Sequence, residues 1–381
     1  MSYSCNAQLQ SLMNIKTWAY QLQGMNISQI AADTSFGLVI IDYSSDGTDA
    51  EKFSPTQIAQ IKVSGKKVIS YISIGEAEDY RYYWQSSWST TPPSWLGPEN
   101  PNWAGNYKVK FWDPAWQNIV FSYVDTIINQ GFDGIYMDII DGYYYWMVEN
   151  PQQQYADTLM MQFVKNIRNH VDSVTGNTDF IMIPQNAEDI INSINVSVPQ
   201  KSAYFNAVNA TGIEDVFCYG DLDEDNPYSP DAYRIGQLQE WQSNNKQVFS
   251  IEYLTQTTLI NQYINGAHSN NFVPYVCTRA LDQLCSGIPV SIEKTPDDKN
   301  LLLFPNPSSG IVFISSDMLD NNSEIFLFSS LGQILKNYRL NELKKSGNWQ
   351  IIDLSMFPDE IYYIEIASEK GNSFKKVIRS H

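Results

Sequence analysis

Residues 66–76 read KKVISYISIGE, a β-rich and mostly apolar run that ends in a glycine and an acid. Residues 37–42 read GLVIID and show the same arrangement. Continuous apolar runs of this kind are typical of parallel strands whose two faces are both covered. We predict eight such strands in this part of the chain, at residues 17–22, 38–43, 67–74, 134–138, 180–185, 213–219, 247–252 and 272–276.

Amphipathic stretches separate the predicted strands. In residues 157–171, for example, apolar side chains recur at helical spacing. Eight β–α units within about 280 residues match the usual size of a (β/α)8 TIM barrel. The predicted fold class is therefore α/β, with a TIM barrel over residues 1–286. A doubly wound sheet is the alternative, but no glycine-rich phosphate loop follows the first predicted strand.

The composition changes after residue 286. Residues 287–300 are mostly polar, contain two prolines and are predicted to form a linker. From residue 301 onward, short runs alternate apolar and polar side chains, as in IYYIEIAS at residues 361–368. This period of two, with turn residues between the runs, predicts a small all-β sandwich domain over residues 301–381.

The chain is acidic, with a formal net charge of -18 from 42 Asp and Glu against 24 Lys and Arg. This argues against a nucleic-acid partner, because phosphates attract a basic surface. An acidic surface attracts a cationic polymer such as an amino-sugar polysaccharide, but it also simply keeps an exported protein soluble. No apolar stretch is long enough for a transmembrane segment, and residues 1–10 lack the pattern of a signal peptide.

Cysteine and histidine are both rare in this chain. The spacing of the four cysteines fits neither a zinc motif nor a CxxC pair, although Cys277 and Cys285 are close enough in sequence to bridge in an oxidising compartment. The three histidines are far apart, which argues against a histidine-based triad or a multi-histidine metal site. The positions are Cys5, Cys218, Cys277 and Cys285, and His170, His268 and His381.

Acids stand at or just beyond the ends of four predicted strands, where a TIM barrel places its active site. They are Asp42, Glu76, Asp138 and Glu252. One such acid is explained by helix capping, but four on one rim favour function. Two carboxylates across a cleft are the machinery of glycoside hydrolysis. A magnesium or calcium site is the rival interpretation. Because no EF-hand-like spacing occurs, we expect neither a metal nor a cofactor.

Further candidates for substrate contact lie on the same predicted rim. Polar residues at other strand ends are Tyr20, Ser73, Asp141, Asn186 and Tyr253. The insertion at residues 79–114 is rich in Trp and Tyr and is long for a loop between a strand and a helix. We expect Tyr80, Trp84 and Trp112 to provide stacking surfaces for sugar rings. Arg81 is expected to pair with a rim acid and hold this insertion.

Four motifs carry a family resemblance. They are LVIIDYSSDG (38–47), VISYISIGEAEDYRYYW (68–84), ENPNWAGNYKVKFWDPAWQ (99–117) and GFDGIYMDIIDGYYYW (131–146). With them, the first domain resembles glycoside hydrolase family 114, the endo-α-1,4-polygalactosaminidases. The resemblance implies a (β/α)8 barrel that cleaves α-1,4-linked galactosamine polymers.

The same resemblance suggests catalytic residues. It carries the strand-four acid onto Asp138, with Asp141 beside it. The family also has a Glu after strand six, and with our predicted strand Gly220 stands at that place. The second catalytic carboxylate is therefore assigned to Glu252 or, failing that, to Asp221 or Glu224.

The second domain resembles the type IX secretion sorting domain. The motifs are FPNPSSGIVFI (304–314), LGQIL (331–335) and the basic ending FKKVIRS (374–380). This resemblance implies the type IX secretion machinery as a partner and a secreted or cell-surface location. A signal sequence is then expected to precede the chain.

Two main function hypotheses follow. The first is a secreted glycoside hydrolase that acts on an amino-sugar polysaccharide through paired carboxylates. The second is a non-catalytic carbohydrate-binding surface protein on a barrel scaffold, which Gly220 motivates. A metal-dependent hydrolase or deacetylase is a third and weaker hypothesis.

Overall fold

The chain divides into two compact units, Met1–Ser291 and Ile292–His381. The computed structural model describes residues 12–176, 179–285, 301–316, 319–320, 323–329, 334–346, 349–368 and 371–380. The predicted linker, residues 287–300, lies outside the described residues.

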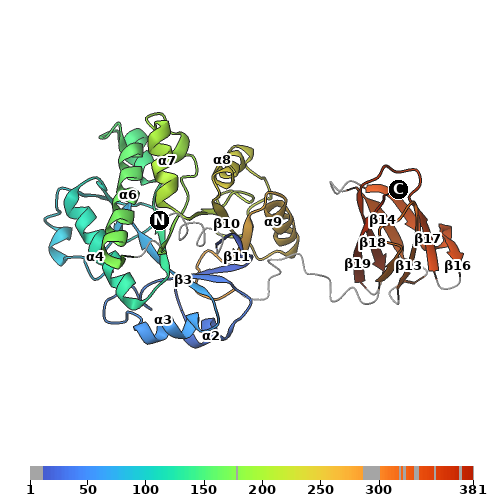
Figure 1. The fold of residues 1–381 in the computed structure, drawn as a ribbon. Coiled ribbons are helices and arrows are strands. Elements are labelled where there is room, and N and C mark those ends of the chain that lie inside the picture. The colour runs from blue at the N-terminus through green and yellow to red at the C-terminus, as the bar shows by residue number, and fades with distance from the viewer. Residues whose placement is uncertain are drawn as a thin grey trace. The chain divides into compact units, whose positions relative to one another are not determined.

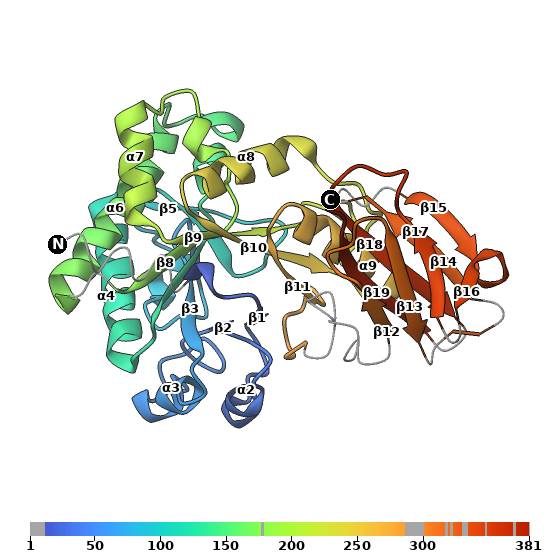
Figure 2. The same cartoon turned by 45° about the vertical axis from the view of Figure 1, so that its right-hand side comes forward.

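The first unit contains eight parallel strands in two sheets (Figures 1 and 2). The five-stranded sheet has the order β1-β2-β3-β7-β8, and the three-stranded sheet has the order β11-β10-β9. The strands are almost entirely buried, as the continuous apolar runs predict. Their bounds are Trp18–Gln21 (β1), Leu38–Ile41 (β2), Lys67–Ser73 (β3), Gly134–Asp138 (β7), Ile181–Pro184 (β8), Ala210–Glu214 (β9), Gln247–Tyr253 (β10) and Val273–Cys277 (β11).

The two sheets approach one another at both edges. A parallel bridge between Gln185 and Gly212 links the end of β8 to β9. At the other edge, the Trp18 indole N–H of β1 donates to the carbonyl of Val273 in β11 (2.9 Å). Among the described residues, however, no strand ladder joins β1 to β11. The mixed α/β architecture is therefore established, and full closure of an eight-stranded barrel stays a prediction.

Helices lie on the outside of these strands (Figure 2). They are α2 (Ile27–Ala32), α3 (Pro55–Lys62), α4 (Pro114–Gln130), α5 (Gly142–Tyr144), α6 (Ala156–Thr175), α7 (Val198–Ala207), α8 (Ala232–Ser243) and α9 (Thr257–Ser269). Helix α4 shows how the sequence sets such bounds. Asp113 caps its first turn by accepting from Ala115 N, Pro114 fits the first helical position, and Gly131 ends the helix with a φ of 85°.

The sixth predicted strand was placed too late in the chain. We predicted residues 213–219, whereas β9 spans Ala210–Glu214. The strand ends because Asp215 adopts a φ of 55°, which extended backbone excludes. The apolar residues that follow, Val216 to Cys218, are buried in a turn and not in a strand. Glu214, and not a residue near 220, therefore closes the sixth strand.

The Trp- and Tyr-rich insertion supplies two strands of a small antiparallel sheet, and the segment just before it supplies the third. The strands of this sheet are β4 (Glu76–Glu78), β5 (Leu96–Glu99) and β6 (Asn106–Val109), in the order β4-β6-β5. The pairing sets Glu76 opposite Lys108. The first unit also contains short helical turns, at η1 (Ser86–Ser89), η2 (Tyr145–Glu149) and η3 (Ile190–Asn192).

The second unit consists of two four-stranded antiparallel sheets, β12-β13-β17-β16 and β15-β14-β18-β19 (Figure 1). In β18, buried and more exposed residues alternate along the strand, so its apolar positions face one core. The period-two pattern thus gave the correct all-β architecture. The bounds are Leu301–Phe304 (β12), Ile311–Ser316 (β13), Glu324–Phe328 (β14), Ile334–Arg339 (β15), Lys344–Ser346 (β16), Trp349–Asp353 (β17), Ile361–Ser368 (β18) and Gly371–Ile378 (β19), with a helical turn η5 at Leu340–Glu342.

Membrane-spanning helices were searched for separately. Across the described ranges, no helix has the length and apolar character needed to cross a bilayer.

Candidate active site

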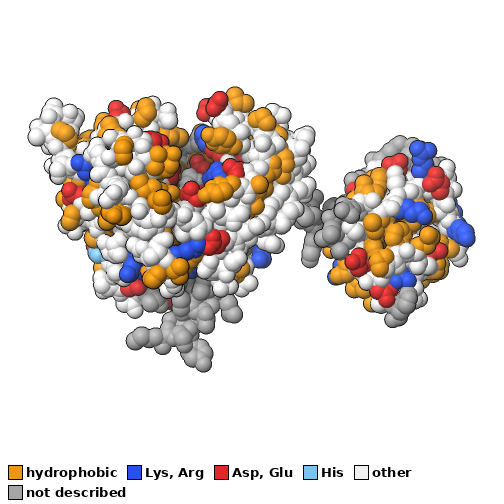
Figure 3. Space-filling model, turned by 90° about the horizontal axis from the view of Figure 1, so that it is seen from above, with side chains coloured by type: hydrophobic (Ala, Val, Ile, Leu, Met, Phe, Trp, Pro, Cys, Tyr) orange, Lys and Arg blue, Asp and Glu red, His pale blue; other side chains and the backbone are white. Residues whose placement is uncertain are grey.

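A cleft of about 1020 Å³ opens at the carboxyl ends of the parallel strands. Nine acidic residues line it against three basic ones, so its lining carries an excess of acids. On the face drawn in Figure 3, acidic and basic side chains lie close together around a hollow of this unit. The charged lining residues are Asp42, Asp46, Glu76, Glu78, Asp138, Asp141, Glu149, Asp189 and Glu214, with Arg81, Lys108 and Arg279.

Asp138 is the last residue of β7 and lies in this cleft. Its Oδ2 accepts a hydrogen bond from the Tyr71 hydroxyl (2.8 Å), and its Oδ1 accepts one from the backbone N–H of Ile139 (2.8 Å). Burial, and then the nearby carboxylate of Glu214, raise the pKa of Asp138 well above the usual value for Asp. The two hydrogen bonds oppose that shift because they favour the ionised form.

Glu214 is the last residue of β9 and lines the same cleft. Its Oε2 accepts a hydrogen bond from the side-chain amide of Gln185, whose own oxygen accepts from the Tyr20 hydroxyl (3.2 Å). Burial, and then the neighbouring charge of Asp215, raise the pKa of Glu214 to about 7. Two carboxyl groups with raised pKa values therefore share one cleft. Such pairs are typical of sites that transfer protons near neutral pH.

Residues with strained backbone conformations lie next to these carboxylates. Residues with positive φ directly follow the acids at the ends of β7 and β9, namely Ile139 (58°) and Asp215 (55°), and Asn186 (60°) lies just beyond β8. Gly75 allows the chain after β3 to pass close to Ile139, because a Cβ at Gly75 would lie 2.1 Å from the Ile139 carbonyl oxygen. Strain of this kind is concentrated at functional sites in proteins.

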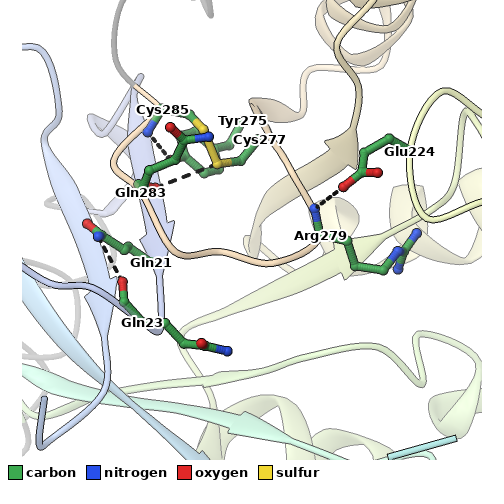
Figure 4. The surroundings of a disulfide bond; sticks show 8 residues. All are labelled: Gln21, Gln23, Glu224, Tyr275, Cys277, Arg279, Gln283 and Cys285. Carbon is green, nitrogen blue, oxygen red and sulfur yellow. Dashed lines mark hydrogen bonds between the residues drawn. A yellow bond between two sulfur atoms is a disulfide. The ribbon is translucent and has the colours of Figure 1, made fainter. Parts of the chain in front are cut away.

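Arg279 connects the loops that follow β9 and β11. Its guanidinium forms a two-pronged ion pair with Asp215 (3.0–3.1 Å) and stacks over the Tyr253 ring, 4.0 Å from the ring centre. Its backbone N–H donates to the Glu224 carboxylate (3.1 Å; Figure 4). Arg279 was not among the predicted site residues, although it stands two residues after the end of β11.

Arg81, which also lines the cleft, is almost fully buried between two acids. Its Nη1 lies 2.7 Å from Asp42 Oδ2, and its Nε lies 2.6 Å from Glu78 Oε2. Tyr80 donates its hydroxyl to Glu78 Oε1 (2.5 Å) and stays 44% exposed to the cleft. Arg81 thus pairs with a rim acid and holds the insertion, as the sequence predicted.

Glu76 and Asp141 form a second acidic group in the cleft. Glu76 Oε1 accepts from Lys108 Nζ (2.9 Å) and from Asn100 Nδ2 (2.9 Å), whereas its buried Oε2 has no hydrogen-bond partner among the described residues. Asp141 is exposed at the mouth of the cleft. Desolvation by the cleft walls raises the pKa of Asp141, Lys108 opposes this shift, and Glu76 adds to it.

The structure does not bring Glu252 into the cleft with Asp138. Its carboxylate is fully buried and accepts three backbone N–H groups, from Val216 (2.8 Å), Phe217 (2.7 Å) and Cys218 (3.2 Å). Burial raises the pKa of Glu252 to about 8, although the three N–H donors oppose that shift. Glu252 therefore holds the turn that follows β9, where the predicted strand was misplaced.

Asp221 and Gly220 are exposed in the loop between β9 and α8, and neither lines the cleft. Gly220 therefore does not stand at the end of the sixth strand. The presence of glycine at residue 220 no longer supports the hypothesis of a non-catalytic carbohydrate-binding protein. The sequence did hold a signal for Glu214. The short run ATGI at residues 210–213 is followed directly by Glu-Asp. The strand was predicted too late in the chain because residues 216–218 are more apolar.

The remaining predicted substrate contacts divide into two groups. Tyr20, Asn186 and Tyr253 line the cleft, together with Asp42, Glu76, Tyr80, Arg81 and Asp141. Ser73 is buried and bonds to the backbone of Glu76, while Trp84 packs on Trp88 and Trp112 on Trp146. None of these three lines the cleft.

Trp103 was not predicted, although it belongs to the same Trp-rich insertion. It is 57% exposed and lines the cleft. The search for metal sites was restricted to the described residues. Within them, no group of three or more His, Cys, Asp or Glu is arranged to hold a metal ion.

Family models match both units. The model of glycoside hydrolase family GH114 matches residues 3–289. The model of a secretion system C-terminal sorting domain matches residues 302–380.

Relatives with similar sequences are uncharacterised proteins of microorganisms. One from Methanocaldococcus jannaschii is 39% identical over 276 residues, covering 70% of this chain and 77% of the relative. One from Thermotoga maritima is 34% identical over 280 residues, covering 71% of this chain and 83% of the relative.

Two solved structures share the fold of the first unit at low sequence identity. The glycoside hydrolase domain of PelA from Pseudomonas aeruginosa has a TM-score of 0.54 and 13% identity, over 71% of this chain and 97% of that one. Aspergillus fumigatus Ega3, solved in complex with galactosamine, has a TM-score of 0.51 and 18% identity, over 71% and 95% of the two chains.

Proposed function

The chain belongs to glycoside hydrolase family GH114, and from this premise we propose that it is a secreted hydrolase of an amino-sugar polysaccharide, with Asp138 and Glu214 as its catalytic pair. One observation carries the proposal. Two partly buried carboxyl groups with raised pKa values end β7 and β9 and line one cleft. Glycoside hydrolysis needs one protonated and one ionised carboxyl group on opposite sides of the scissile bond.

The hydrogen bonds around the pair suggest which group carries the proton. Asp138 accepts two hydrogen bonds that favour its ionised form, so it serves as the carboxylate at the anomeric carbon. Glu214, with a pKa of about 7, serves as the acid. The bond from the anomeric carbon to the leaving oxygen breaks, and that oxygen takes the proton of Glu214. Water supplies the new anomeric hydroxyl, and its proton returns to the carboxyl pair.

The acidic cleft supports a cationic substrate. Its excess of carboxylates attracts the ammonium groups of an unacetylated hexosamine more strongly than neutral acetamido groups. The galactosamine bound in the crystals of Ega3, whose fold is similar, points in the same direction. We therefore propose partially deacetylated α-1,4-linked polygalactosamine as the substrate class.

Exposed aromatic rings supply the proposed stacking surfaces. Trp103, Tyr80 and Tyr144 line the cleft and are 57%, 44% and 49% exposed. An aromatic ring packs against the apolar face of a sugar, and Trp also attracts an ammonium group over its face. A cleft of about 1020 Å³ is at the upper end of the usual range for ligand pockets, roughly 300–1,000 Å³, which suits several sugar units.

The sorting domain supports secretion. A match over residues 302–380 favours handling by the type IX secretion machinery and a secreted or cell-surface location. We further propose that the eight strands of the first unit close into a full (β/α)8 barrel, since β1 and β11 already lie side by side.

The test is the release of reducing ends from partially deacetylated polygalactosamine. We expect release by the wild-type chain and a loss of about 10²-fold or more in Asp138→Asn, which keeps the shape of the side chain. Fully acetylated polymer of the same length is the matched control, and it should be cleaved more slowly. Equal rates on the two polymers would contradict the electrostatic part of the proposal. Binding without release would turn the proposal toward a carbohydrate-binding protein.

A further inference from the structure

The disulfide-closed loop after β11 reaches the catalytic side of the cleft. Cys277, the last residue of β11, is bonded to Cys285, and the residues between them include Arg279. Figure 4 shows Arg279 projecting from this loop, with its backbone N–H directed at Glu224. Residues 279–281 also line the cleft, so the loop forms part of its wall.

The same loop is fastened to the segment that follows β1. The carbonyl oxygen of Leu281 accepts hydrogen bonds from Leu22 N (2.9 Å) and Gln23 N (3.1 Å). Gly24 permits a further close approach, because it has a φ of 61° and a Cβ there would lie 2.6 Å from the Asp282 carbonyl oxygen. These bonds span the edge at which β1 and β11 share no strand ladder among the described residues. The loop is thus fixed from two sides.

From this fixed loop, Arg279 holds the residue next to Glu214. Its guanidinium makes three contacts of 3.0–3.1 Å with the Asp215 carboxylate, and its Nε donates to the Asp223 carbonyl oxygen (3.0 Å). A two-pronged contact between Arg and a carboxylate fixes orientation as well as distance. Since Asp215 directly follows Glu214, this ion pair joins Arg279 to the backbone next to Glu214.

We propose that Arg279 is a positioning residue for Glu214, and that the Cys277–Cys285 disulfide holds the loop from which Arg279 acts. The proposal rests on the catalytic role of Glu214. Arg279 acts in two ways: it fixes the turn at Asp215, and it balances the negative charge of Asp215 beside the acid. The disulfide keeps the turn of chain that carries Arg279 from moving away from β9.

The charge effect depends on every ionisable group that faces Glu214. Asp215 raises the pKa of Glu214 and Arg279 lowers it. Without Arg279, the unbalanced charge of Asp215 raises that pKa further. The facing groups are Tyr20 of β1, Tyr136 and Asp138 of β7, Asp141, Asp215, Tyr253 of β10 and Arg279.

The first test measures the Glu214 pKa without substrate, by a carboxyl ¹³C NMR titration of the full chain. The Glu214 signal is assigned by its loss in Glu214→Gln. We expect Arg279→Ala to raise this pKa by about one unit. Adding Asp215→Asn to Arg279→Ala should return it toward the wild-type value, because both charges are then removed. An unchanged pKa in Arg279→Ala would overturn the charge effect.

The second test is the pH dependence of kcat/KM for the same variants. Arg279→Ala should lower kcat about 10-fold and move the alkaline limb upward with the pKa of Glu214. Arg279→Lys keeps the charge but lacks the fork, so its alkaline limb should match wild type while kcat falls. Arg168→Ala, which removes a partly buried arginine of α6, is the control and should leave both unchanged. If it lowers kcat as much as Arg279→Ala, the positioning role is refuted.

The third test removes the disulfide with the double variant Cys277→Ser/Cys285→Ser. We expect the far-ultraviolet circular dichroism to stay unchanged and the Glu214 pKa to rise by less than in Arg279→Ala. A wild-type pKa and kcat in this variant would show that the disulfide does not act through Arg279. Failure of the catalytic assignment is recognised separately, because Glu214→Gln would then remain fully active while the titration still reports the link between Arg279 and Glu214.

Discussion

Glu214 and Glu252 stand at or next to the ends of neighbouring strands, β9 and β10. Glu214 is partly buried and Glu252 fully buried, and their pKa values are raised to about 7 and about 8, respectively. Their partners differ. Glu252 accepts three backbone N–H groups from its own chain, whereas Glu214 faces the cleft, Asp138 and a single side-chain amide. A strand-end position and a raised pKa are therefore common to both. They differ in whether hydrogen bonds from the backbone occupy the carboxylate oxygens or leave them accessible to a ligand.

Replacing each acid by its amide tests the difference between Glu214 and Glu252. In Glu214→Gln we expect kcat to fall by about 10²-fold or more, because the proposed proton donor is lost, whereas the thermal midpoint should not fall. In Glu252→Gln the amide NH₂ faces backbone N–H groups, so stability should fall by about 1–3 kcal/mol while kcat per folded molecule stays close to wild type. Urea unfolding and initial rates measure the two effects.

The reverse pattern would return the second catalytic role to Glu252. A stable Glu252→Gln with kcat reduced about 10²-fold is that pattern. Asp221→Asn is the control, because it changes an exposed acid outside the cleft. It should alter neither rate nor stability.

The pH dependence of stability provides a separate test of the environment of Glu214. The pKa of Glu214 is raised in the folded chain to about 7 from an ordinary value of 4.5. A raised pKa means that its contribution to stability is fully present below pH 4.5 and is lost as pH rises through 7. We therefore expect Glu214→Gln to be as stable as wild type at pH 4 and more stable at pH 8. Thermal unfolding at the two pH values measures this. If wild type were instead more stable than Glu214→Gln at pH 8, the result would contradict the sign of the pKa shift.

The sequence predicted the architecture well where one signal dominated. Seven of the eight strands were found close to their predicted places, because each is a buried run with few competing interpretations. At β9 two signals competed. The run ATGI is short and weakly apolar. Residues 216–218 are strongly apolar and buried, but they form a turn and not a strand. Local pattern does not report that a buried Glu252 supplies the hydrogen bonds which allow such a turn.

The site was predicted in part for the same reason. The acids Asp42, Glu76 and Asp138 were predicted because they stand at or just beyond well-defined strands, and all three line the cleft, while their roles stay a prediction. Glu214 was missed with its strand. Arg279 was not predicted, because its proposed role depends on Asp215, which is 64 residues away in sequence. Such contacts follow from the three-dimensional arrangement and leave no periodic trace in the chain.

Tryptophans of the insertion extend the comparison from acids to rings. Trp112 packs edge-on against Trp146 and Phe111, so neighbouring rings of the protein contact its surface. Trp103 lies in a turn held by the bonds of its N–H to Asn100 O (3.2 Å) and of its carbonyl to Asn106 N (3.1 Å), and its ring is 57% exposed in the cleft. The fold thus holds the Trp103 backbone and leaves its ring free. We expect Trp103→Ala to raise KM for long polymer about 5- to 20-fold, equivalent to about 1–2 kcal/mol, without lowering the thermal midpoint.

The control reverses that pattern, since Trp112→Ala should lower the thermal midpoint and leave KM unchanged. Binding can be measured apart from turnover in Asp138→Asn, by following tryptophan fluorescence as oligomers of increasing length are added. If Trp103 forms an outer stacking surface, its removal weakens the binding of long oligomers more than that of the monosaccharide. Equal loss for every length would instead place Trp103 beside the scissile bond. No loss at all would mean that exposure in a cleft is not enough to identify a ring that binds sugar, and the comparison would then hold only for the acids.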